Sequence, residues 1–180
     1  FTEQHFTVAK DEFEKVIEGV EQIEGFDALV VTLEEHLNID ASPNDFQEYY
    51  DLFKNMTAYV DTNYTDNTSR TFIARGSEAG LVLMSLFLED AETSVFQNVI
   101  ATDSPSNFNS FVTNMIDDDD FPKNKQNKKL HFSFSSSNSF SSCTNLINTI
   151  EDAQFPWLQF ESKQYSTTFP TTYPESFAAG

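Results

Sequence analysis

Apolar residues fall along this chain in short runs that alternate between two spacings. Helical spacing, with an apolar side chain every three or four residues, is found at 11–23 and 43–60. Short β-branched runs at 28–33, 71–74 and 96–101 are typical of buried parallel strands. The same criteria predict strands at 6–9, 130–134 and 157–160, and helices at 79–88, 108–116, 145–150 and from 175 onward.

Strands that alternate with helices at these distances predict βαβ units, and therefore an α/β fold with a mostly parallel sheet flanked by helices. The 180 residues fit one domain, and neither a repeat nor a linker is apparent. We therefore expect a single domain over residues 1–180. The segment 133–142, in which seven of ten residues are Ser, is predicted to be a loop because Ser favours local turns.

Composition narrows the possible partners. Phe is the most frequent aromatic residue, with 19 copies, and can supply a large core. The net charge of −19 repels phosphate backbones and anionic lipid, so nucleic acid and membrane surfaces are poor partners. No run of 18 apolar residues occurs, so direct membrane insertion is not expected.

The sequence holds no pattern of cofactor or metal ligands. Its His, Cys and carboxylate residues do not have metal-ligand spacing. The run Asp117–Asp120 lacks the spacer residues and the glycine of a calcium loop, and is predicted to be a solvated loop. With only 5 Gly, the chain has no nucleotide-binding loop, and the single Cys143 cannot form an internal disulfide. We predict no cofactor and no metal.

The segment most informative about function runs from residue 70 to 81, with the sequence Arg-Thr-Phe-Ile-Ala-Arg-Gly-Ser-Glu-Ala-Gly-Leu. It passes from a buried strand through a tight turn into an apolar helix, the context of a hydrolase nucleophile. It resembles the elbow of the α/β-hydrolase family that includes esterase D, enterochelin esterases and feruloyl esterases. The resemblance implies that Ser77 occupies the nucleophile position and that Glu78 supplies the amide of the oxyanion hole.

Three further segments match that family in order and spacing. These are the helix end at 59–64 with its Asn-Tyr pair, the strand at 99–106 ending in Ser-Pro-Ser, and the last strand with its tail, 157–180. The resemblance covers about 26–180, and it implies that the first strands of the sheet lie before Phe1. An exposed sheet edge would then need other chain segments to cover it, which suggests a larger polypeptide or assembly.

The departures from the family concern the catalytic groups. Arg75 stands where the family has a glycine, and the C-terminal loop has no histidine, with Ser166 at its expected position. His131 lies inside a predicted strand, where a buried, satisfied structural role is expected. Ser135 and the residues after it occupy the place of the catalytic acid, and Lys163 is a weak candidate for a replacement base. A serine without a base is a very weak nucleophile.

We therefore predict a degenerate, catalytically inactive hydrolase-like protein that acts as a binding or structural subunit. The partners would be other protein subunits, because interface centres favour Phe, Tyr and Trp. The alternative is a weak serine esterase that uses Ser77 with an unidentified base, and only this alternative implies a small-molecule ester. A third interpretation is an unrelated α/β domain, which would lack a tight strand–helix turn at 75–79. The family resemblance favours a periplasmic or cell-surface location.

Overall fold

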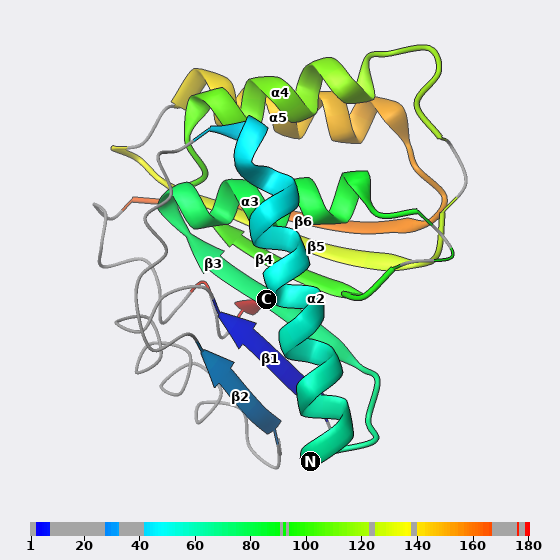
Figure 1. Cartoon of the computed structure of the whole chain (residues 1–180). Coiled ribbons are helices and arrows are strands. Elements are labelled where there is room, and N and C mark those ends of the chain that lie inside the picture. Colours follow the sequence, from blue (N-terminus) through cyan, green and yellow to red (C-terminus); the bar gives the residue numbers. More distant parts are fainter. Residues whose placement is uncertain are drawn as a thin grey trace.

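The computed structural model describes residues 3–7, 28–32, 42–90, 92, 94–122, 125–137, 140–166, 176, 179 and 180. They contain one six-stranded sheet in the order β2-β1-β3-β4-β5-β6, and every strand pair in it is parallel. The strands are β1 (Glu3–Thr7), β2 (Ala28–Thr32), β3 (Arg70–Arg75), β4 (Asn98–Thr102), β5 (Lys128–Ser135) and β6 (Leu158–Tyr165). The helices are η2 (Pro43–Asp45), α2 (Phe46–Asn63), α3 (Gly76–Leu88), α4 (Ser106–Ile116) and α5 (Phe140–Ala153). The predicted α/β fold is confirmed (Figure 1).

The two faces of the sheet differ in polarity. On one face, alternate residues of the central strands join the main hydrophobic core with side chains from α2, α3, α4 and α5. Phenylalanine rings fill this core: the Phe72 ring lies 4.7 Å from that of Phe53 on α2 and 4.3 Å from that of Phe96. The opposite face carries Ile73 and Ile100 but also Thr, Ser and His side chains, all of them buried. Here the Ser176 hydroxyl lies 2.7 Å from that of Thr102, joining the C-terminal segment to the sheet.

Most predicted elements are present, with shifted ends. The Ser-rich segment is the clearest correction, since it is not one loop. Ser133 and Ser135 continue β5, and α5 already begins at Phe140 rather than at 145. In β5 the small serines alternate with buried Phe132 and Phe134, so the strand keeps an apolar core face although its composition suggests a turn. The helix predicted at 11–23 lies outside the described residues.

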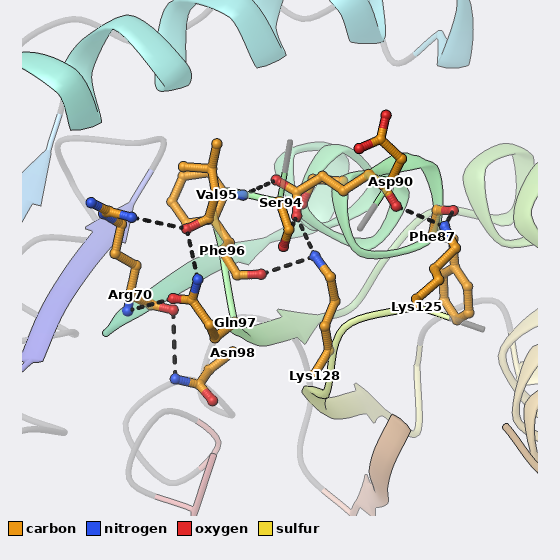
Figure 2. Close-up of polar contacts among 12 residues, drawn as sticks. Arg70, Phe87, Asp90, Ser94, Val95, Phe96, Gln97, Asn98, Lys125 and Lys128 are labelled. Atoms are coloured by element: carbon orange, nitrogen blue, oxygen red, sulfur yellow. Dashed lines mark hydrogen bonds and ion pairs between the residues drawn. The ribbon is translucent and has the colours of Figure 1, made fainter. Parts of the chain in front are cut away.

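A buried ionic network lies where α3 ends, beside the amino-terminal ends of β4 and β5 (Figure 2). The Glu89 carboxylate pairs with Lys128 Nζ, and both side chains are at least 99% buried. The same carboxylate accepts hydrogen bonds from the Tyr50 hydroxyl and the Val95 amide. Lys128 Nζ also donates to the Phe96 carbonyl at 3.0 Å. Burial lowers the pKa of Lys128 and raises that of Tyr50, so the network depends on its internal pairing.

The neighbouring Lys125 completes the end of α3. Its Nζ donates to the Phe87 carbonyl, and to the Glu89 carbonyl at 2.8 Å. The ammonium lies 5.2 Å from the Phe121 ring centre and 5.8 Å from that of Trp157. Burial lowers the pKa of Lys125 to about 8, against the opposing effect of Glu89. A lysine here caps carbonyls that a helix end leaves without partners.

Two predictions about the surface can be compared with the described residues. The run Asp117–Asp120 is exposed at the end of α4, as expected of a solvated loop. Within the described part of the chain, no helix combines the length and the apolar character needed to cross a bilayer.

Candidate active site

Strand β3 passes directly into helix α3, and this junction is the candidate elbow. Arg75 ends β3 with an extended backbone, φ −129° and ψ 163°. Gly76 is the first helical residue and has φ 57°, a left-handed value that favours glycine. Ser77 and Glu78 follow in the first turn of α3, both half-buried. A tight strand–helix turn is therefore present, contrary to the interpretation as an unrelated α/β domain.

The strained residue of this turn is Gly76, one position before the predicted nucleophile Ser77. Successive residues of an α-helix are rotated by about 100° around its axis, so the two positions face different directions. The sequence could not show this one-residue offset, because residues 75–81 match the family motif with Ser77 at the nucleophile position. Only the backbone conformation of the turn shows that Gly76, and not Ser77, has the left-handed φ.

Gly80 determines how closely α3 approaches α4. A Cβ atom on Gly80 would lie only 2.2 Å from Cγ of Phe108, which is fully buried on α4. The glycine therefore allows α3 to pack directly on the Phe108 ring. Its role is in packing behind the elbow, and it keeps the start of α3 in place.

Asp103 is a carboxylate beside the elbow that the sequence interpretation did not select. Arg75 pairs with Thr102 in the sheet, so the next residues, Gly76 and Asp103, leave adjacent strands at the same edge. Asp103 is 3% exposed and has φ 57°, which is uncommon for a residue with a side chain. Its Oδ1 accepts the Ser135 amide at 2.7 Å, and its own amide donates to the Ser133 carbonyl at 2.9 Å. Its Oδ2 is buried without a hydrogen-bond partner among the described residues.

These contacts give Asp103 a structural role at the carboxyl ends of β4 and β5. They leave Oδ2 of Asp103 buried without a hydrogen-bond partner among the described residues. The signal in the sequence was a lone acidic residue directly before the Ser-Pro-Ser segment. Because many surface turns contain such a residue, its burial could not be inferred from the chain alone.

His131 lies too far down its strand to serve the elbow. Thr102 pairs with Ser133, so the residue level with Asp103 is Phe134, three residues beyond His131. Three residues span about 10 Å along a strand, well beyond hydrogen-bond reach of the turn. His131 is 4% exposed, as expected, and neither ring nitrogen has a hydrogen-bond partner among the described residues.

The electrostatic surroundings of His131 favour the neutral imidazole. Burial is the largest effect and lowers its pKa. The Glu161 carboxylate, whose Oε2 is 3.9 Å from Nδ1, raises the pKa, and Lys163 lowers it further.

The two remaining catalytic positions predicted from the resemblance lie at the same edge of the sheet. Ser135 ends β5 where the acid was expected, is fully buried, and lies 3.2 Å from the Ser137 hydroxyl. Ser166 follows the end of β6 and is exposed. The assignments of Ser77, Glu78 and Ser166 remain predictions, and the segment 167–175 lies outside the described residues.

Metal and thiol chemistry can be considered for the described side chains. They contain no group of three or more His, Cys, Asp or Glu residues arranged to hold a metal ion. Cys143 is fully buried on α5, and burial raises the pKa of its thiol to about 11. A buried, protonated thiol is a poor nucleophile.

The α/β fold of the described residues is similar to that of several solved hydrolase structures. An IroE-like serine hydrolase from Shewanella oneidensis matches with a TM-score of 0.77 and 12% identity, over 99% of this chain and 68% of that one. The siderophore hydrolase EstA from Aspergillus nidulans matches at 0.75 and 10%, over 99% and 80%. An uncharacterised protein from Capnocytophaga ochracea matches at 0.75 and 10%, over 98% and 53%.

No model of a known protein family matches the chain, and no curated protein does so. At identities of 10–12% the structural likeness establishes the fold. The α/β-hydrolase-like fold that the sequence suggested is confirmed.

Proposed function

We propose that this chain is a hydrolase-fold protein without esterase activity of its own, which serves as a binding subunit in a larger assembly. The observation that carries the proposal is the left-handed backbone of Gly76 at the junction of β3 and α3. In a nucleophile elbow the strained residue of the turn is the nucleophile itself. A glycine at that position has no hydroxyl to present.

The distribution of the other catalytic groups supports the same proposal. His131, the histidine whose side chain lies among the described residues, is buried about 10 Å down β5 from the level of the elbow. Asp103 is near the turn, but a carboxylate normally orients and stabilises an imidazole and does not replace it. Ser77 therefore lacks a base within hydrogen-bond reach among the described side chains.

A second candidate function is a weak serine esterase that uses Ser77. It is favoured by the position of Ser77 in the first turn of the buried helix α3, where the helix dipole stabilises a developing negative charge. The base would then come from outside the described side chains. The structural neighbours that are named as hydrolases also favour this candidate.

One experiment separates the two candidates. The wild-type chain, Ser77→Ala and Gly76→Ser are incubated with a fluorophosphonate probe and with p-nitrophenyl acetate. For a non-catalytic subunit we expect no labelling of wild-type or Ser77→Ala protein, and equal background hydrolysis by both. Stoichiometric labelling of Ser77, with hydrolysis that Ser77→Ala abolishes, would establish the esterase instead.

The Gly76→Ser variant tests whether a base serves the left-handed position of the turn. It places a hydroxyl at the strained position, at a cost of about 1–2 kcal/mol for the left-handed backbone. We expect Gly76→Ser to remain unlabelled by the fluorophosphonate, because its hydroxyl would have no base within hydrogen-bond reach among the described side chains. Stoichiometric labelling of residue 76 in this variant would show that a base does serve the turn, and it would overturn the proposed lack of activity.

A further inference from the structure

A cavity of about 710 Å³ lies at the amino-terminal edge of the sheet. It is lined by residues at the start of β4, β5 and β6 and in the segments that lead into β3, β4, β5 and β6. Because the strands are parallel, the elbow lies at the opposite, carboxyl-terminal edge, so this cavity is a separate site. Its volume falls within the range of about 300–1,000 Å³ that is typical of small-molecule sites.

The register of the sheet brings a row of polar side chains to the cavity. Asn98 pairs with Lys129, and Lys129 pairs with Gln159. The next residue of each strand packs in or against the main core, so the three polar side chains point to the opposite face of the sheet. Neighbouring strands are about 4.8 Å apart, and the row therefore spans about 10 Å.

Two amide side chains form a fixed wall of the cavity (Figure 2). Gln97 Oε1 accepts the Arg70 amide at 3.0 Å, and Gln97 Nε2 donates to the Val95 carbonyl at 3.3 Å. Asn98 Nδ2 donates to the Arg70 carbonyl at 3.5 Å. These contacts hold the wall against the start of β3.

Three other lining residues have side chains that are free to bind a ligand. Asn127, Lys129 and Gln159 are exposed, and no other described residue forms a hydrogen bond or an ion pair with their side chains. The two amides each offer donors and an acceptor, whereas the ammonium offers donors alone. They come from two neighbouring strands and the segment before β5, so they approach one ligand from different sides.

The charge of the lining differs from that of the chain. None of the residues that line this cavity is Asp or Glu, although 29 of the 180 residues are acidic. By contrast, the cavity at the ends of α4 and α5 is lined by Asp117, Asp118 and Asp152. Lys129 disfavours a cationic ligand, and the net charge of −19 repels an anionic one. The cavity is therefore suited to a neutral, polar ligand.

Hydroxyl groups match this lining, because each hydroxyl both donates and accepts, as an amide does. Pro156 and Leu158 add apolar surface that can pack against the C–H groups of a sugar ring. Trp157 also contributes to the lining, but it is only 4% exposed, so its ring lies behind the surface of the cavity.

We propose that this cavity binds a neutral carbohydrate. Asn127 and Gln159 exchange hydrogen bonds with hydroxyl groups of the sugar, and Lys129 donates to a further hydroxyl. This site goes beyond the proposed role as a subunit and does not depend on it, because it lies at the other edge of the sheet from the elbow.

Isothermal titration calorimetry of the full chain with glucose, galactose and mannose tests the proposal, and each hexose is compared with its uronic acid and its amino sugar. We expect saturable binding of at least one neutral hexose and weaker binding of its charged derivatives. Trp157 is the single tryptophan of the chain, so its fluorescence provides a second, local measurement. A disaccharide of the same hexose identifies the source of the ligand. Tighter binding than the hexose indicates a glycan chain, and equal or weaker binding indicates the free sugar.

The double variant Lys129→Ala/Gln159→Ala removes two of the proposed hydrogen-bonding groups and should bind the hexose at least about tenfold more weakly. The matched control is Lys54→Ala/Gln164→Ala, which makes the same chemical changes at exposed positions outside the cavity lining. This control should bind as the wild type does. Circular dichroism of each variant checks that the fold is retained.

No saturable signal from any of the neutral hexoses in either measurement would overturn the proposal, and so would equal affinities of the two double variants. Tighter binding of a uronic acid or an amino sugar than of its hexose would overturn the assignment of a neutral ligand. Ester hydrolysis by the wild type would refute the proposed lack of activity and leave the sugar titrations unaffected, so the two failures can be told apart.

Discussion

Gly76 and His131 illustrate how single residues limit what this site can do. The left-handed backbone of Gly76 lets β3 turn into α3 without a connecting residue, although the bulky Arg75 precedes it. The same glycine leaves the strained position without a functional group. His131 has the functional group but lies at a level of the sheet where its imidazole is enclosed. The chain thus contains both a strained turn and an imidazole, but at separate places.

The enclosed imidazole predicts a pH dependence of stability. Burial lowers the pKa of His131 in the folded protein, while the unfolded chain takes up this proton below about pH 6.5. The unfolded state therefore binds more protons as the pH falls, and the free energy of unfolding decreases. The nearby Glu161 reduces the effect without reversing it, because the net shift is still downward.

The measurement is urea unfolding of the wild type and of His131→Leu at several values between about pH 5 and pH 7.5. Leucine has a similar size and does not titrate, so the wild type should lose more stability than the variant as the pH falls. Other titrating groups are common to both proteins and cancel in the difference. Parallel pH profiles would mean that His131 does not contribute.

At the scale of elements, the contact between α3 and α4 depends on the absence of one Cβ atom. Alanine in place of Gly80 would gain about 1 kcal/mol of helix propensity in open space. Here its Cβ would meet Cγ of Phe108 at 2.2 Å, so we expect a net loss of about 1–3 kcal/mol from overpacking. Thermal unfolding of Gly80→Ala shows whether the substitution stabilises the protein through helix propensity or destabilises it through overpacking. Adding Phe108→Leu should restore part of the loss, whereas additive losses would argue against a direct clash.

The buried pair that joins the end of α3 to β5 supports a second prediction. Lys128→Met leaves the Glu89 carboxylate buried without its cation, and such losses cost about 3–5 kcal/mol. Changing Glu89→Leu as well removes the uncompensated charge, so the double variant should recover much of the stability.

The chain contains a matched control for this prediction on α2. Lys54 pairs with Asp51 at 2.6 Å, but the two side chains are 38% and 50% exposed. Lys54→Met should therefore change the free energy of unfolding by under about 1 kcal/mol in denaturant titrations. Similar losses of unfolding free energy from Lys128→Met and Lys54→Met would show that breaking a buried ion pair costs no more than breaking an exposed one.

The same elements show what the sequence could predict. The runs around Val30, Ile73 and Ile100 identified parallel strands correctly, because short continuous apolar runs are typical of the strands of a parallel sheet. The prediction failed where composition and pattern conflict, as in β5, whose serines fit between phenylalanines. The sequence also did not show which residue of the elbow is left-handed, because a one-residue offset changes the backbone angles but hardly changes the pattern of apolar residues. The buried Asp103 depends on contacts between β4 and β5, which are distant in sequence.

At the scale of the whole molecule, the large net negative charge opposes the compact folded state. The chain carries 29 acidic and 10 basic residues, and folding brings the excess carboxylates closer to one another than they are in the unfolded chain. Self-repulsion of this kind keeps a protein soluble but destabilises its compact state. The described ion pairs relieve it only locally, as at Arg70 and Asp61, which pair at 2.5 Å.

This imbalance predicts that salt stabilises the protein. Raising NaCl from about 10 mM to about 100 mM shortens the screening length from about 30 Å to about 10 Å, so the melting temperature should rise. Two exposed positions allow the net charge to be changed in opposite directions. Asp119→Asn removes a negative charge, and Lys129→Gln removes a positive one. At low salt the first should melt above the wild type and the second below it, and the three curves should converge as salt is added. Differences that persist unchanged at high salt would show that local contacts of these side chains, and not the net charge, determine their effects.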